Sequence, residues 1–201
     1  DVWAVGGTGT SGAFAWRWDG SSWRDEPLPD GLVDTTSLFK VWGNAADDVW
    51  LVGSRGTILH WDGSAFTAAN STTTRTLTTV HTTPDRVVAV GGFGSGTIVQ
   101  RDIGGDFRDV SPEGAQQTMG VWLVGSEDGW ASGINGSLLR YREGMWTFHD
   151  TGFNLAEAFH AVWVDPDGGV WAVGGQVLSE PLVQGIMLHR GAMIPGGTYR
   201  E

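Results

Sequence analysis

Short apolar runs separated by turn-forming residues repeat along this chain. The clearest stretch, residues 38–66, reads LFKVWGNAADDVWLVGSRGTILHWDGSAF and contains three apolar runs and a weaker fourth one. Gly, Asn, Asp and Ser separate the runs, and these residues favour turns. In the run Val49-Trp50-Leu51-Val52 both alternating faces are apolar, which predicts a strand covered on both sides. The stretch therefore predicts a four-stranded sheet that needs a similar sheet on either face.

The same pattern recurs at a regular interval. A polar residue followed by Val-Trp-Ala/Leu-Val-Gly, or by a weaker version of this motif, marks each copy. The second apolar position of the motif is occupied in turn by Trp3, Trp50, Val88, Trp130 and Trp171, and we call these the marker residues. A period of about 40–45 residues with about four strands is typical of propeller blades. No window shows helical periodicity over three turns, so the sequence predicts an all-β chain.

Counting the copies predicts a five-bladed β-propeller of four-stranded antiparallel blades in one domain, residues 1–201. The expected blades lie at about 1–30, 37–71, 76–112, 117–150 and 157–201. The first blade lacks its inner strand, because the sequence opens inside the motif at Asp1. Either residues 192–201 close the ring beside this blade, or the missing strand lies upstream. In the second case the ring could have more blades than these five. Because the sequence opens at Asp1 without Met, we expect a processed or trimmed piece.

Two phrases of the sequence carry a resemblance to a known group of repeats. DDVWLVGSRGTILHWDGSAF and DVWAVGG…WRWDGSSW resemble the Trp-rich propeller repeats of bacterial extracytoplasmic proteins, which are similar in form to kelch and Asp-box repeats. The resemblance covers nearly the whole chain. It implies a propeller fold and a secreted, periplasmic or cell-surface location, and it leaves the function open, since such propellers include enzymes, lectins and docking scaffolds.

Composition narrows the classes of partner and chemistry. The 201 residues include 12 Trp and 32 Gly but no Cys, which excludes disulfides and thiolate metal sites. The net charge of −11 makes a nucleic acid or an anionic membrane surface a poor partner. No apolar run is long enough to span a bilayer, so we expect no membrane insertion. We expect a protein or glycan partner and no cofactor.

The tryptophans have two possible roles. Those at the marker position are expected to fill the space between blades, where removing one would be costly. Outer tryptophans could instead stack on sugar rings, and Trp18 and Trp61 are the candidates that we retain for this role. Packing is the favoured interpretation even for these, because they also lie at repeat positions.

One position of the inner strand holds Trp in the second, fourth and fifth blades. In the third blade the same position holds His81. His81 could therefore face the central channel, although a hydrogen-bonded packing role is the favoured alternative. The five histidines include no closely spaced ligand pair and no HExxH motif. No nucleophile motif appears in a suitable context, so the sequence predicts no enzymatic activity.

Acidic residues recur in the turn before the marker motif. Asp165 and Asp167 are the best candidates there for binding Ca²⁺. Because acids recur at this place in several copies, capping of backbone N–H groups in the turn is the favoured interpretation.

Loops on one face of a propeller commonly carry recognition. The loops that follow the marker motif contain Arg55 and Asn135, and the longest of them, residues 174–185, contains Gln176 and Glu180. We expect a non-enzymatic recognition module that binds a protein or cell-surface polymer through this loop face. A carbohydrate-binding propeller is the alternative, and a glycoside hydrolase is the least favoured one.

Overall fold

The structure is a computed structural model and describes residues 2–8, 12–32, 36–176 and 184–192. These residues form five antiparallel sheets and no α-helix. The first sheet contains β1 (Val2–Thr8), β2 (Gly12–Trp18) and β3 (Trp23–Asp25). The second contains β4 (Leu38–Ala45), β5 (Asp48–Gly53), β6 (Ile58–Trp61) and β7 (Phe66–Ala69), with a single 3-10 turn, η1 (Ser54–Gly56), between β5 and β6.

The remaining sheets repeat this plan. The third contains β8 (Leu77–Thr83), β9 (Arg86–Gly91), β10 (Thr97–Asp102) and β11 (Arg108–Asp109). The fourth contains β12 (Thr118–Val124), β13 (Asp128–Gly133), β14 (Leu138–Arg142) and β15 (Met145–His149). The fifth contains β16 (Ala158–Val164), β17 (Val170–Gly175) and β18 (Gly185–Arg190). In every sheet the strands pair in chain order, which is the arrangement of propeller blades.

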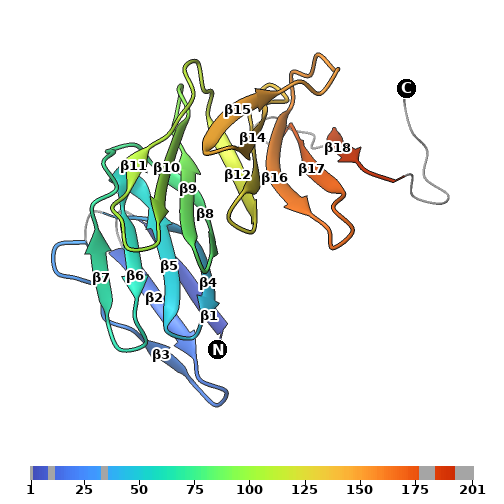
Figure 1. Ribbon diagram of the computed structural model, residues 1–201. Coiled ribbons are helices and arrows are strands. Elements are labelled where there is room, and N and C mark those ends of the chain that lie inside the picture. The colour runs from blue at the N-terminus through green and yellow to red at the C-terminus, as the bar shows by residue number, and fades with distance from the viewer. Residues whose placement is uncertain (1, 9–11, 33–35, 177–183, 193–201) are drawn as a thin grey trace.

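The sheets stand side by side in an arc (Figure 1). The inner strands β4, β8, β12 and β16 pack against one another in succession, so they line the inner side of the arc. The first sheet and the last sheet lie at opposite ends of it (Figure 1). The structure therefore confirms the all-β, five-bladed arrangement and the absence of an inner strand from the first sheet among the described residues. The proposed closing tail falls in residues 193–201, outside the described part.

The core lies between the sheets, as the doubly apolar strands require. Between the first and second sheets, Trp3 and Val5 pack against Val49, Leu51 and Trp61. Equivalent apolar layers separate the second sheet from the third, the third from the fourth and the fourth from the fifth. Because the middle strands of the second, third and fourth sheets are each covered by two neighbouring sheets, their residues are apolar on both faces.

Acidic side chains help to hold three marker tryptophans in place, two of them through a direct hydrogen bond. In the second sheet the indole N–H of Trp50 donates to Asp48 over 2.8 Å, and the same carboxylate lies 2.9 Å from Nε2 of His60. The His60 ring stacks on Trp50 with 4.1 Å between ring centres. Burial raises the pKa of Asp48, but hydrogen bonds from Asn44, Trp50 and His60 outweigh it and hold the pKa below its ordinary value.

The fifth sheet repeats this arrangement with different residues. Oδ2 of Asp165 accepts the indole N–H of Trp171 at 2.9 Å, and the Trp171 ring stacks on His189 at 4.0 Å. In the fourth sheet Arg140 takes the place of the histidine: it pairs with Asp128 at 2.7 Å and lies 5.0 Å from the centre of the Trp130 ring. The acids that recur in these turns therefore hold the packing tryptophans directly in the second and fifth sheets and through Arg140 in the fourth.

Candidate functional site

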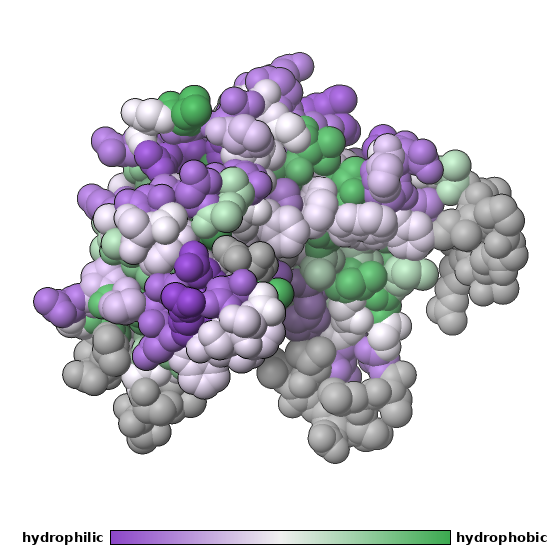
Figure 2. Space-filling view, turned by 90° about the horizontal axis from the view of Figure 1, so that it is seen from below, coloured by the Kyte–Doolittle hydropathy of each residue, from purple (hydrophilic) through white to green (hydrophobic). Residues whose placement is uncertain are grey.

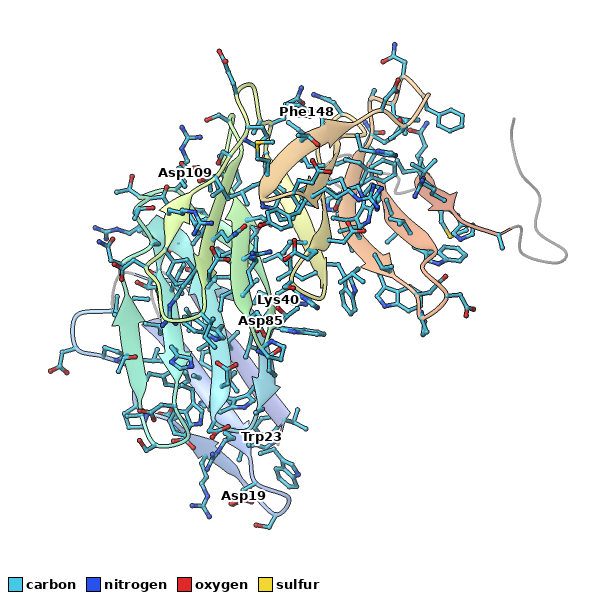
Figure 3. The ribbon with its side chains drawn as sticks, in the orientation of Figure 1. Asp19, Trp23, Lys40, Asp85, Asp109 and Phe148 are labelled. Atoms are coloured by element: carbon cyan, nitrogen blue, oxygen red, sulfur yellow. The ribbon has the colours of Figure 1, made fainter. Side chains whose placement is uncertain are left out.

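The inner strands bring four aromatic rings together on the inner side of the arc. Trp42, His81, Trp122 and Trp163 each lie opposite a marker residue, on β4, β8, β12 and β16. They line a cavity of about 290 Å³ together with Lys40 and His160. Figure 3 labels Lys40 on this inner side of the arc. No acidic side chain is among the described residues that line the cavity.

The His81 ring lies between two indoles. Its centre is 4.8 Å from the Trp42 ring, with an angle of 29° between the planes, and 4.3 Å from the Trp122 ring. The two indoles also meet edge to face at 5.6 Å. The His81 side chain is 6 % exposed, so the stack is a packed group of rings rather than a set of free side chains.

A single hydrogen bond assigns the tautomer of His81. The backbone N–H of Leu123 donates to Nδ1 over 3.2 Å, so the proton of the neutral ring is assigned to Nε2. Burial lowers the pKa of His81 to about 4, and the nearby Lys40 charge acts in the same direction. The ring is therefore neutral at physiological pH. Its Nε2 atom is buried and has no hydrogen-bond partner in the described part of the chain.

The four rings form one wall of the cavity, which we call the aromatic inner wall, and two further polar side chains lie beside them. Nε2 of His160 is likewise buried without a hydrogen-bond partner among the described residues. The ammonium of Lys40 lies 5.9 Å from the centre of the Trp42 ring. Flat aromatic surfaces next to unpaired ring nitrogens and one cation can bind a ligand that combines an apolar group with an oxygen acceptor.

Two wider clefts lie between the outer parts of neighbouring sheets. One, of about 570 Å³, lies between the second and third sheets and includes Trp50 and Arg101. The other, of about 490 Å³, lies between the fourth and fifth and includes Trp130 and Arg190 at the equivalent positions. Trp50 and Trp130 are each only 2 % exposed, so these clefts offer polar side chains rather than an open indole face.

The two tryptophans predicted as sugar platforms lie in the first and second sheets, away from the cavity. Trp61 is 2 % exposed, because it fills the layer between these sheets, with Trp3 at 5.4 Å and Phe66 at 5.1 Å. Its ring is not open to a sugar, so the sugar-binding candidacy of Trp61 is wrong and the favoured packing interpretation agrees with its burial. Trp18 is partly exposed and lies 5.8 Å from Trp23 on the neighbouring strand.

The predicted loop residues do not line the cavity. Arg55 and Asn135 occupy equivalent tight turns with positive φ angles of 59° and 54°, which suggests that both serve the turn. The Asn135 side chain donates to the Gln116 side chain over 2.7 Å. Gln176 is exposed at the end of β17. Glu180 lies outside the described residues.

Of the two calcium candidates, Asp165 has a structural role, and Asp167 contributes its backbone N–H. Oδ1 of Asp165 accepts the backbone N–H groups of Asp167 and Gly169 over 3.0 and 2.7 Å, in addition to the indole bond at Oδ2. The hydrogen bond from Trp171, followed by that from Gly169, lowers the pKa of Asp165. Across the described ranges, no three His, Asp or Glu side chains gather closely enough to hold an ion.

Sequence reasoning identified one member of the aromatic wall as a site candidate, His81, and missed Lys40 and His160. Lys40 precedes Trp42 by two residues on the same strand, a spacing that places both on one face. His160 could not be found in this way, because a register shift between Phe159 and Ala161 breaks the alternation of faces.

No protein-family model and no curated protein matches this chain. Among solved structures the chain is similar to YCF48 from Cyanidioschyzon merolae, with 14% identity and a TM-score of 0.61 over 86% of this chain and 60% of that one. It is also similar to a structure of YCF48 bound to D1 peptide, with 18% identity and a TM-score of 0.60 over 86% and 56% of the two chains.

A third similar structure is that of a protein provisionally named a gluconolactonase, with 14% identity and a TM-score of 0.57 over 83% and 65% of the two chains. This chain therefore spans about 56–65% of the length of these three proteins. The described residues include no helix long and apolar enough to cross a membrane. At identities this low the likeness shows the fold alone, and that fold is a β-propeller.

Proposed function

We propose that this propeller is a non-enzymatic recognition module that binds an extended peptide segment of a partner protein at its aromatic inner wall. The observation that carries the proposal is the row of rings formed by Trp42, His81, Trp122 and Trp163. The Nε2–H of His81 in this row has no hydrogen-bond partner among the described residues. The proposed binding surface therefore lies on the inner strands, whereas the sequence favoured the loops.

The chemistry of the wall suits a peptide. Indole faces and edges pack well against proline and other apolar side chains. A buried N–H without a partner is unfavourable, so a ligand carbonyl or carboxylate that reaches the His81 ring would gain from satisfying it. Lys40 adds a positive charge to a cavity whose described lining residues include no acid. An apolar peptide with a carboxylate beside it therefore fits these groups best.

One similar structure supports the choice of ligand class. YCF48 was solved bound to D1 peptide, and it shares the fold of this chain. At 18% identity the likeness does not carry individual contacts from one protein to the other. The proposal therefore depends on the residues of the wall themselves.

The test is selection of peptides from a random phage-displayed library on the immobilised 201-residue chain. The Trp42→Ala/Trp122→Ala double variant serves for counter-selection, and Trp23→Ala is the matched control, since Trp23 is 49 % exposed and lies on β3. We expect peptides that bind wild type and the control but lose at least tenfold in affinity for the double variant. Peptides that bind all three proteins equally, or no enriched peptide, would contradict the proposal.

A second candidate function is carbohydrate binding in the two outer clefts. Their equivalence in the repeat favours it, because Trp50 and Arg101 in one correspond to Trp130 and Arg190 in the other. A glycan array probed with wild type and with the Arg101→Ala/Arg190→Ala variant tests this reading. Binding of one sugar that needs these arginines supports the lectin. The kinship with kelch or Asp-box repeats and the extracytoplasmic location stay predictions.

A further inference from the structure

Three polar side chains in the cavity depart from the pattern that the inner strands otherwise repeat. His81 stands where the other three inner strands hold tryptophan. Lys40 pairs with Val52 across the sheet, and the residues at the equivalent place are Thr79, Gly120 and Ala161. His160 lies in the register shift of its strand, where the other inner strands hold Phe39, Thr78 and Met119. The other sheets pack without a charged or imidazole group at these places, so the repeat itself does not require them.

Two of these side chains carry a buried nitrogen that stays unsatisfied. Polar groups on the surface are ordinary in this chain: Figure 2, which views the molecule from below, shows hydrophilic residues over much of its left part and hydrophobic ones gathered over the last sheet on the right. Nε2 of His81 and Nε2 of His160, by contrast, are buried without a hydrogen-bond partner among the described residues. A buried nitrogen without a partner destabilises the fold, and departures of this kind gather at functional sites.

Lys40 contributes a charge that the cavity does not balance. It is the only lysine of a sequence whose net charge is −11. None of the ion pairs found among the described residues includes Lys40, and no described residue that lines the cavity is acidic. His81 is neutral, so it adds an N–H donor and no second charge. One cation beside imidazole nitrogens matches a ligand group that carries a single negative charge and accepts several hydrogen bonds.

We propose that Lys40, His81 and His160 form a subsite for one carboxylate group, while the indoles beside them hold an apolar group next to that carboxylate. The inference rests on the proposed function, because it specifies which part of a peptide the wall selects. At about 290 Å³ the cavity lies at the small end of the range for ligand pockets, so it admits the carboxylate and one neighbouring apolar group. A free chain end and the side chain of an acidic residue both offer this chemistry.

The test compares three small probes that share an acetylated proline. The first ends in a free carboxylate, the second carries its carboxylate on a following glutamate whose own end is an amide, and the third is the plain amide without a carboxylate. Reductive methylation with ¹³C preserves the charge of a lysine, and in this chain it labels only Lys40 and the amino terminus. NMR follows this methyl signal together with the ¹⁵N signals of the His81 and His160 rings. The indole N–H signal of Trp42 gives the affinity of each probe.

We expect both acidic probes to move the Lys40 and His81 signals, and the plain amide to bind at least tenfold more weakly, because it brings no negative charge. The acid that binds more tightly shows whether a chain end or a side chain supplies the carboxylate. In Lys40→Met the acids should lose at least tenfold in affinity while the amide is unaffected, whereas Lys40→Arg should keep the preference for acids. Arg142→Met is the matched control, since Arg142 is an exposed cation at the end of β14.

Equal affinity for acids and amide, unmoved Lys40 and His81 signals, or an unchanged preference in Lys40→Met would overturn the subsite. Lys40 is partly exposed, so its variants should fold, and thermal unfolding checks this. Library peptides that need Trp42 and Trp122 but bind equally well without any carboxylate refute the subsite and keep the proposed function. Carboxylate probes that bind through Lys40, with no peptide enriched from the library, keep the subsite and refute the proposed function.

Discussion

His81 differs from the other rings of the inner wall because it can take up a proton. The structure holds it neutral between Trp42 and Trp122, with Nδ1 accepting from Leu123 and the pKa lowered to about 4 by burial and by Lys40. The unfolded chain restores a pKa near 6.5. Between these two values the unfolded state binds a proton that the folded state does not.

Folding stability is therefore expected to fall as the pH is lowered from about 6.5 to about 4. The contribution of His81 over this window is on the order of 3 kcal/mol, because its pKa is about 4 in the folded chain and near 6.5 in the unfolded one. His81→Gln keeps an acceptor for the Leu123 N–H but does not titrate. Urea unfolding of both proteins across this range should give wild type the steeper pH dependence, whereas parallel curves would contradict the neutral, buried His81.

Burial separates tryptophans that the sequence alone treats alike. Trp50 is 2 % exposed and meets Asp48, His60 and the edge of Phe107, whereas Trp23 is 49 % exposed. Trp50→Ala should lower the free energy of unfolding by ~3–5 kcal/mol. Trp23→Ala should lower it by less than about 1 kcal/mol. Denaturant unfolding measures both, and similar losses for the two would show that Trp50 is not a core residue.

The sequence could predict the middle strands at the scale of elements, because their physical signal is strong. In β5 both faces are apolar and a glycine ends the run, so the expected DVWLVG strand coincides with Asp48–Gly53. The outer strands carry a weaker signal, and β11 has only two residues, Arg108–Asp109. A strand with one neighbour and one wet face needs little apolar patterning.

The inner strands could be located from the sequence, but the directions of their side chains could not. Each of the four has a register shift near its start, as between Leu77 and Thr79 in β8. A shift of this kind moves every preceding side chain to the other face. Trp42 comes after the shift in its strand, so its position could be recognised from the repeat. His160 lies within the shift in its strand, so the sequence could not place it on the wall.

Turn geometry gives a prediction at the same scale. Gly56 and Gly104 both have positive φ, 73° and 72°, but a Cβ at Gly56 would collide with the Thr73 carbonyl oxygen, whereas at Gly104 it would meet open space. Gly104→Ala should cost about 1–2 kcal/mol for the left-handed backbone alone. Gly56→Ala should cost clearly more, because the turn between β5 and β6 must also shift. Thermal unfolding compares the two, and equal costs would refute the close approach.

At the scale of the whole molecule the repeat explains both the arc and the wall. One sheet cannot cover its own two faces, so the sheets stack, and stacking brings the inner strands together along one line. The sequence predicted this arrangement from the period of its motif. The site could be predicted only in part, since it depends on which residues of four separated strands converge, and the loop residues favoured by the sequence lie elsewhere.

The central claim is that peptides bind the aromatic inner wall, and the indole N–H resonances of ¹⁵N-labelled protein test it most directly. Titration with a peptide from the library should shift the resonances of Trp42, Trp122 and Trp163, assigned by single substitution. The resonances of Trp50 and Trp130, which are buried between sheets, should stay in place. Shifts confined to Trp16, Trp18 or Trp23 on the first sheet, with the inner-wall signals unmoved, would contradict the account.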